Sequence, residues 1–199
     1  MATFAELVAD VKVMTNRPDL DADIKQAVKA ATLKMHRLDY FPRDLVETGI
    51  QWTTPDYLQS LDYKTLFPLW RGFKYLRKYD ATTTPGTAGK FFTFLSPEKV
   101  VDGYGIDRID ICYLAGASIN IRSGTQDQYM LIGYYANPDV AESTYDSWIA
   151  RDHPYAIEFE AKRQIFQNIG FQEQASQTAK DVDEQIALLK ISEVTGIGY

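Results

Sequence analysis

The chain has 199 residues, of which 45% are hydrophobic and 24% are charged, and its formal net charge at pH 7 is −6. This composition predicts a globular protein with one ordinary domain, or one domain that carries a large insertion. The acidic balance argues against nonspecific binding to nucleic acid or to an anionic membrane, because both need an excess of Lys and Arg.

The chain carries a single cysteine, Cys112, which excludes an intrachain disulfide and a cysteine-rich metal site. Its first residues, MATFAELVADVKVM, lack the basic region of a secretory signal. No apolar run approaches the roughly 20 residues that are needed to span a bilayer. We therefore expect a protein that is made and kept in a cytoplasm, with no membrane partner.

Two helices are predicted at the N-terminal end. Thr3 and Glu6 have the spacing of a capping box, and apolar residues then repeat at helical intervals up to Met14. The segment NRPD (16–19) ends this helix, because proline biases the residue before it away from helical conformations. A second amphipathic helix follows. Its apolar stripe consists of Ile24, Val28, Ala31, Met35 and Leu38.

The middle of the chain, from residue 45 to about 140, has the pattern of strands and loops. Three runs alternate apolar and polar residues, as a strand with one buried face does. The run 129–135 is almost entirely apolar, which predicts a strand that is buried on both faces. We expect an antiparallel meander. The alternating runs are 46–53, 109–114 and 119–122.

Helices return after Asn137-Pro138. A short helix is expected within 143–151, and a long one begins at Pro154 with apolar residues at every fourth position. Gly170 lies where a left-handed C-cap is expected, and a last helix then completes an αα-hairpin. The final residues are apolar but contain two glycines, so we expect an extended tail there.

The predicted fold class is α+β: a small antiparallel helical bundle made from the N- and C-terminal helix pairs, with a β-rich insertion between them. Neither helix pair can bury its apolar stripe alone, and packing the two pairs together is the simplest closure. The predicted segments are 1–44 for the N-terminal pair, 45–140 for the β-rich insertion, 141–191 for the C-terminal helices and 192–199 for the extended C-terminal tail.

Patterns of catalytic and cofactor-binding residues are weak. His36 and His153 are expected to be ordinary surface or helix-capping residues, because no serine lies in a nucleophile-elbow pattern. Cys112 lies in a strand pattern and is expected to be buried and inert. We expect a protein that is not an enzyme and has no catalytic residue, cofactor or metal.

Acidic residues give two further patterns. The run DLDAD (19–23) begins like a calcium loop but lacks the glycine and the glutamate of that loop, so we interpret it as the acidic start of a helix. Short-range pairs such as Asp107 with Asp110, or Glu158 with Glu160, are common by chance in a chain with 27 acids. The spacing of these pairs alone does not support a hydrolase.

The stretch from Lys64 to Tyr79 interleaves basic and aromatic residues. This pattern fits a surface that binds single-stranded nucleic acid, a sheet edge whose rings pack inward, or a protein interface. All three stay open from the sequence. The candidates for an inter-subunit or tail interface are Trp70, Arg71, Phe73, Tyr75 and Arg77.

Two segments resemble the head-to-tail adaptor proteins of tailed bacteriophages, also called head-completion or connector proteins. The first is FAELVADVKVMTNRPDL (4–20) with the helix after it. The second is HPYAIEFEAKRQIFQNIGFQEQA (153–175) with a helix ending in IALLKISEV. The likeness covers roughly the first 45 and the last 50 residues. In the second segment the similar positions are Pro154, Tyr155, Ile157, Ala161, Phe166, Gly170 and Glu173.

The resemblance implies a structural protein of the virion neck that is made in the host cytoplasm. Proteins of that family form a ring of twelve copies below the portal protein and link it to tail or nozzle proteins. DNA passes through the central channel without specific binding. The resemblance also implies that the C-terminal tail docks onto the portal. The tail residues expected to bind it are Ile191, Val194, Ile197 and Tyr199.

Two other classes of function stay open. A β-rich module that binds a ligand such as carbohydrate would use Trp52, Trp70 and the tyrosines. An enzyme would have to use one of the acid pairs.

Overall fold

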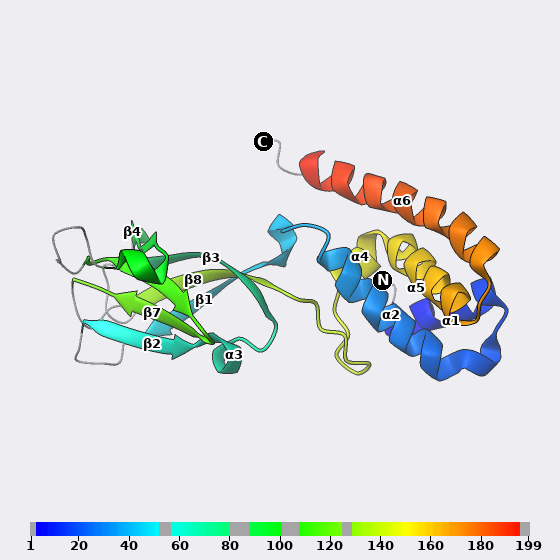
Figure 1. Cartoon of the computed structure of the whole chain (residues 1–199), viewed down its shortest axis with the longest axis horizontal. Coiled ribbons are helices and arrows are strands. Elements are labelled where there is room, and N and C mark those ends of the chain that lie inside the picture. Colours follow the sequence, from blue (N-terminus) through cyan, green and yellow to red (C-terminus); the bar gives the residue numbers. More distant parts are fainter. Residues whose placement is uncertain (1–2, 52–56, 80–87, 101–107, 125–128, 196–199) are drawn as a thin grey trace. The chain divides into compact units, whose positions relative to one another are not determined.

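The computed structural model describes residues 3–51, 57–79, 88–100, 108–124 and 129–195. It shows a mixed α+β protein with helices at both ends of the chain and β-sheets in the middle, which confirms the predicted class (Figure 1). The chain divides into two compact units. We call residues 1–44 and 137–199 the helical unit, and residues 45–136 the β unit.

The N-terminal helices begin as predicted. Thr3 and Glu6 form the capping box of α1 (Phe4–Thr15), with Glu6 N donating to Thr3 Oγ1 at 3.2 Å. A short 3-10 turn, η1 (Pro18–Leu20), leads into α2 (Asp21–His36). Asp21 forms ion pairs with Lys12 and Lys25, so this acid belongs to the helix start that the sequence predicted.

Three further helices complete the helical unit: α4 (Trp148–Asp152), α5 (Pro154–Asn168) and α6 (Gln172–Thr195). Gly170 turns α5 into α6 with a φ of 85°, a conformation that favours glycine. The extended tail predicted from residue 192 is wrong over 192–195, because α6 continues through Thr195. Residues 196–199 lie outside the described part of the chain.

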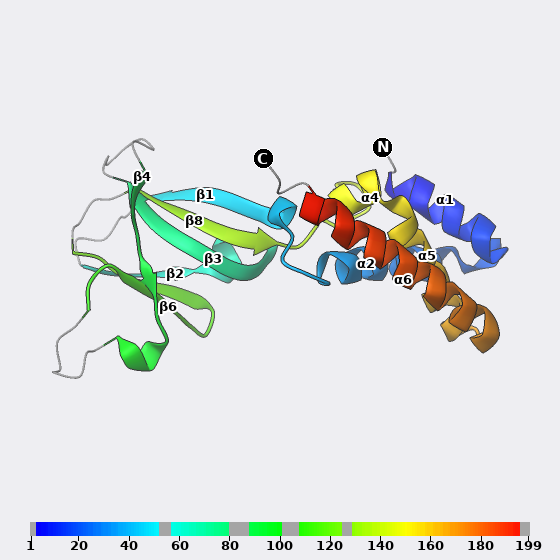
Figure 2. The same cartoon turned by 90° about the horizontal axis from the view of Figure 1, so that it is seen from above.

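The core of the helical unit surrounds α5, which packs against α1, α2, α4 and α6 (Figures 1 and 2). The apolar stripe predicted for α2 is buried or partly buried in this core. Burying such side chains contributes about 1.5–3 kcal/mol each. The large apolar side chains without any exposure in this core include Leu7, Ile24, Met35, Ile149, Ile157, Ile165 and Leu189.

The first sheet of the β unit joins distant parts of the chain. One of its two inner strands, β8, is antiparallel to β1 on one side and to β3 on the other (Figure 2). Met130 to Tyr135 on this strand are buried, as predicted. The predicted meander is wrong, because β1 pairs with β8 and not with the strand that follows it. The order is β1 (Leu45–Gln51), β8 (Tyr129–Ala136), β3 (Trp70–Tyr79) and β4 (Ala88–Phe91).

The second sheet is built around the hairpin of β6 and β7, which turns at Gly116 with a φ of 60°. Its strands are β2 (Leu58–Asp62), β7 (Ser118–Arg122), β6 (Ile111–Ala115) and β5 (Thr93–Phe94), in that order. Both sheets contribute to one apolar core, with α3 (Tyr63–Leu66) beside β2. Its fully buried members are Leu76, Cys112, Ile119, Ile121, Met130 and Ile132.

Candidate functional site

The five predicted interface residues all lie on β3, but on two faces of the sheet. In the register with β8, Trp70 and Phe73 lie opposite Ala136 and Tyr134, on the face that packs into the β core. Arg71, Tyr75 and Arg77 lie on the other face. The basic and aromatic stretch of the sequence therefore contributes side chains to both faces of the sheet.

Trp70 belongs to an aromatic cluster that packs inward. Its ring stacks on Tyr63 at a centroid distance of 4.7 Å and on Tyr134 at 5.1 Å, while Phe73 stacks on Phe94 at 5.0 Å. These rings stabilise the β unit, each pair by about 0.5–1.5 kcal/mol beyond its buried area. Trp52, the other predicted carbohydrate platform, lies outside the described residues.

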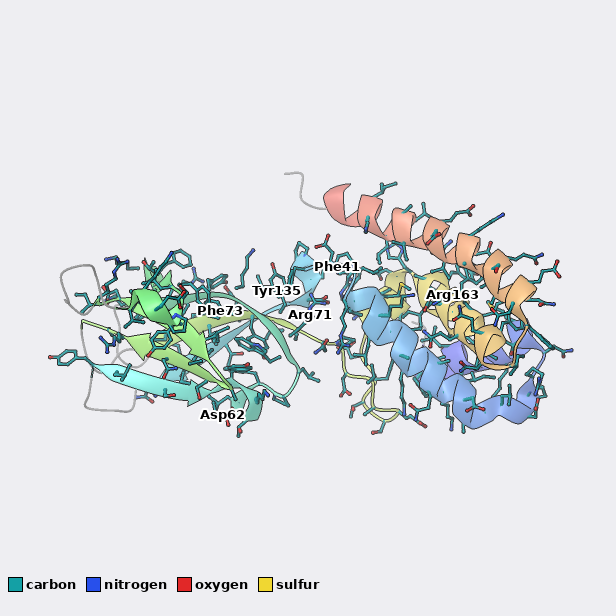
Figure 3. The ribbon with its side chains drawn as sticks, in the orientation of Figure 1. Phe41, Asp62, Arg71, Phe73, Tyr135 and Arg163 are labelled. Carbon is teal, nitrogen blue, oxygen red and sulfur yellow. The ribbon has the colours of Figure 1, made fainter. Side chains whose placement is uncertain are left out.

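The opposite face combines cations with rings. The guanidinium of Arg71 and the ammonium of Lys74 lie 5.7 Å and 5.6 Å from the ring centroid of Tyr135, and Figure 3 shows Arg71 beside Tyr135. Arg77 lies 5.7 Å from the Tyr75 ring and 5.9 Å from the Phe91 ring. We call this surface the cationic face. Its members are Arg71, Lys74, Tyr75, Arg77, Phe91 and Tyr135.

Gly133 leaves room for the ring of Tyr75 on the cationic face. A Cβ at this position of β8 would come within 2.7 Å of the Tyr75 ring, so only glycine leaves room for it. The Tyr75 ring also meets Phe91 edge to face at 5.6 Å, and Arg77 reaches Glu47 on β1 at 3.5 Å. The backbone of the sheet and the neighbouring side chains therefore hold these rings and cations in place.

The second half of α6 has two apolar sides. Val182 and Leu189 are buried in the helical core, whereas Leu188 and Ile191 point outward and are 53% and 60% exposed. The predicted partner-binding role of Ile191 stays a prediction. The side chain of Val194 lies outside the described part, as do Ile197 and Tyr199.

A buried polar network replaces the surface or capping role predicted for His36. This histidine is almost fully buried, and its Nδ1 lies 2.8 Å from Asp44 Oδ1 while its Nε2 lies 2.9 Å from Ser147 Oγ. Trp148 Nε1 donates to the same oxygen of Asp44 at 2.8 Å. We call these four residues the clasp. His153, by contrast, is half-buried at the start of α5, as predicted for a position at a helix start, and its side chain makes no capping hydrogen bond.

The clasp has the Ser-His-Asp order of a nucleophilic triad. When Asp44 accepts from Nδ1–H, the neutral imidazole can accept the Ser147 hydroxyl proton at Nε2. All three side chains are buried, however, and Ser147 Oγ also accepts from Ala150 N at 3.1 Å as the N-cap of α4. The geometry therefore favours a structural link between α2, the turn η2 (Pro42–Asp44) and α4.

Glu158 and Glu160 are both buried, but they do not form a pair. They are two residues apart on α5 and so lie on different sides of the helix. Glu160 accepts hydrogen bonds from Lys34 at 2.8 Å, from Arg163 at 2.7 Å and from Gln164 at 2.9 Å. These three bonds keep the pKa of Glu160 below its usual value despite burial. The pair therefore gives no support to a hydrolase.

Glu158 is the exceptional carboxyl group of the helical unit. Its side chain is 2% exposed, and Oε2 has no hydrogen-bond partner among the described residues. Burial, with a smaller contribution from the negative charge of Asp10 on α1, raises the pKa of Glu158 to about 7. At neutral pH this group is therefore close to half protonated.

The remaining candidates are Cys112 and the pair of Asp107 and Asp110. Cys112 is buried as predicted, and burial raises the pKa of its thiol to about 12. Asp110 binds Lys78 at 2.8 Å, while Asp107 lies outside the described residues. In the described ranges, no three His, Cys, Asp or Glu side chains are placed to hold a metal ion. No described helix has the length and apolar character needed to cross a membrane.

No protein-family model matches the sequence, and no curated protein matches it.

Substitution of Ser147 by alanine tests the clasp. Ser147→Ala removes the N-cap of α4 and leaves Nε2 of buried His36 without its hydroxyl partner, so we expect the free energy of unfolding to fall by roughly 1–3 kcal/mol. Urea unfolding followed by circular dichroism measures this change. Ser143→Ala, in an exposed loop nearby, serves as the control. Equal stability of the two variants would contradict a structural role for the clasp.

Substitution of Glu158 by glutamine tests the raised pKa. The folded protein holds this proton up to about pH 7, whereas the unfolded chain releases it near pH 4.5, so stability falls as the pH rises between these values. Glu158→Gln should remove that fall and stabilise the protein at pH 8 by on the order of 3 kcal/mol. Thermal unfolding from pH 4 to pH 8 measures it.

The matched control is Glu160→Gln, which should destabilise the protein at pH 8 because Glu160 is a hydrogen-bonded carboxylate. An identical pH dependence of wild type and Glu158→Gln would show that the buried carboxyl group keeps an ordinary pKa.

Proposed function

We propose that the chain is a structural head-to-tail adaptor of a tailed phage. It forms a ring under the portal, links the portal to tail or nozzle proteins, and lines the channel through which DNA leaves. The observation that carries this proposal is the organisation of the chain. Both termini build one helical unit, the β unit lies between them in sequence, and the last helix exposes apolar side chains near its end.

The positions that resemble the adaptor family support this proposal through their packing. Ile157 and Ala161 are buried in the core of the helical unit. Phe166 contacts Phe171 across the turn at Gly170, with ring centroids 6.3 Å apart. The pair of rings packs across the turn between α5 and α6, and the resemblance consists of such packing motifs. In the proposed adaptor the helical unit is the bundle, and the β unit is its insertion.

The distribution of charge supports a channel that does not hold DNA. The β unit contains nine basic and nine acidic residues, so the whole net charge of −6 belongs to the helical unit. An acidic wall repels the phosphate backbone and allows a duplex to slide past. We assign the channel-lining role to the helical unit and contact with the tail or nozzle protein to the β unit.

The end of α6 is the proposed portal contact. Leu188 and Ile191 expose apolar surface to water, which does not stabilise a monomer. Exposed apolar residues of this kind mark protein interfaces. Val194, Ile197 and Tyr199 continue this apolar character along the sequence. In the proposed complex these residues insert into the portal ring.

The portal contact is tested by placing a charge at Ile191. Because its side chain is 60% exposed, Ile191→Asp should leave the monomer folded but weaken binding to the portal ring about tenfold or more. Biolayer interferometry with immobilised portal rings of the same virus measures the affinity. Val13→Asp, on α1 with Val13 80% exposed, introduces the same charge elsewhere. Equal portal affinity of wild type and Ile191→Asp would overturn this contact.

A further inference from the structure

Among the described residues, the buried carboxyl group of Glu158 has no cation that acts on it. The residue is 2% exposed, and its Oε2 has no hydrogen-bond partner in the described part of the chain. Lys162, one turn further along α5, lies over the rings of Phe159 and Phe166, 5.9 Å and 5.8 Å from their centroids. A negative charge on Glu158 therefore lacks both water and a counter-ion, and a buried charge in that state is unfavourable.

The helices that pack against α5 carry charged groups, but only Asp10 of α1, within the described residues, acts on Glu158. Asp10 precedes buried Val11, and its charge is negative. α1 thus adds a repulsion to a carboxyl group that burial already keeps from ionising. Charged groups of the other three helices act elsewhere: Lys34 of α2 on Glu160, Arg151 of α4 on Asp146, and Asp183 of α6 on Arg163.

α1 is held to the helical unit by apolar packing and by a contact at the surface. Its buried side chains, Phe4, Leu7, Val8 and Val11, belong to the helical core. The ion pair of Lys12 with Asp21 joins side chains that are 31% and 48% exposed, and such exposed pairs contribute little. The buried hydrogen bonds of the clasp join α2 to α4 and do not involve α1. Displacement of α1 therefore leaves the clasp intact.

We propose that α1 is a hinged arm that opens away from α5 when Glu158 ionises. One motion of this helix lets water reach the carboxylate and carries Asp10 away, so it relieves both effects that oppose the charge. The hinge is the segment 16–20, in which Asn16 ends α1 with a φ of 52°. The open arm exposes the apolar side of α1. This inference does not depend on the proposed adaptor function.

The direction of the pH dependence follows from the two states of the arm. In the closed state, burial and, to a smaller extent, Asp10 raise the pKa of Glu158 to about 7. In the open state the carboxyl group is in water, and its pKa returns to the ordinary value of 4.5. The open population therefore rises up to about tenfold for each pH unit between these values and levels off above pH 7.

Hydrogen exchange of the backbone amides of the full-length protein tests the arm. Protection factors, which are corrected for the intrinsic effect of pH on exchange, are measured by mass spectrometry at pH 5 and pH 8. Those of α1 should fall by on the order of 50-fold between the two pH values. Peptides of α2 should stay better protected than those of α1 at both, because the arm opens locally.

Three variants assign the change to its cause. In Glu158→Gln the protection of α1 should change less than about threefold, because this side chain cannot ionise. Asp10→Asn removes the smaller of the two effects, so it should move the midpoint of the fall to lower pH without abolishing the fall. The matched control is Glu184→Gln, an exposed acid on α6, which should behave like wild type.

The outcomes that would overturn the arm are distinct. Equal protection of α1 and α2 at pH 8 would show that the helical unit opens as a whole. A wild type whose α1 is equally protected at both pH values would show that Glu158 does not drive opening. A fall in Glu158→Gln as large as that of wild type would assign the opening to another group, and an unchanged midpoint in Asp10→Asn would remove α1 as the element that acts on Glu158.

Discussion

The clasp of His36, Asp44, Ser147 and Trp148 is the interaction on which the helical unit depends. Asp44 immediately precedes the first strand of the β unit, and Ser147 follows the last strand by eleven residues. The clasp therefore ties the segment that leaves the helical unit to the segment that returns to it. Buried hydrogen bonds of this kind favour one arrangement of the two segments. Any other arrangement would leave buried polar groups without partners, which costs free energy.

Neighbouring contacts strengthen this tie. Thr32 Oγ1 lies 2.7 Å from the Tyr145 hydroxyl, and Arg43 lies 4.4 Å above the ring of Trp148. Lys29 reaches Glu142 at 3.1 Å. All three pairs join the N-terminal part of the helical unit to its C-terminal part, across more than 100 residues of sequence. A chain with its helices at both ends can then carry an inserted β unit without opening its helical core.

In the proposed adaptor, the clasp and the surface side chains have different roles. Buried polar groups close the helical unit, and packing of α5 against its neighbours gives the unit its stability. Charge and exposed apolar area are placed elsewhere, on α6 and on one face of β3. This separation permits changes at a proposed interface without loss of the fold, because the residues proposed to bind a partner are not the residues that close the core.

Local sequence patterns were sufficient for the helices and insufficient for the long-range contacts. The capping box of Thr3 and Glu6, the stripe of α2 and the turn at Gly170 depend on neighbours within a few residues, and all three were predicted. The pairing of β1 with β8 was missed, because alternation gives the strand faces but not their partners. The predicted end of α6 is too early. The glycines that break the helix begin only at Gly196, so residues 192–195 remain helical.

The clasp could not be predicted from the sequence, because it also depends on contacts between distant parts of the chain. His36 and Ser147 are separated by 111 positions, and nothing in either local sequence indicates the other. The N-cap position of Ser147 before Trp148 was the one available signal. The basic and aromatic stretch was recognised, but its division into an inward and an outward face needed the register with β8.

Native mass spectrometry of the protein with the portal ring of its own virus tests the central claim most directly. The account predicts a single complex whose added mass equals one copy of this chain for each portal subunit. A portal ring that gains no mass from a folded, intact protein would contradict the adaptor role.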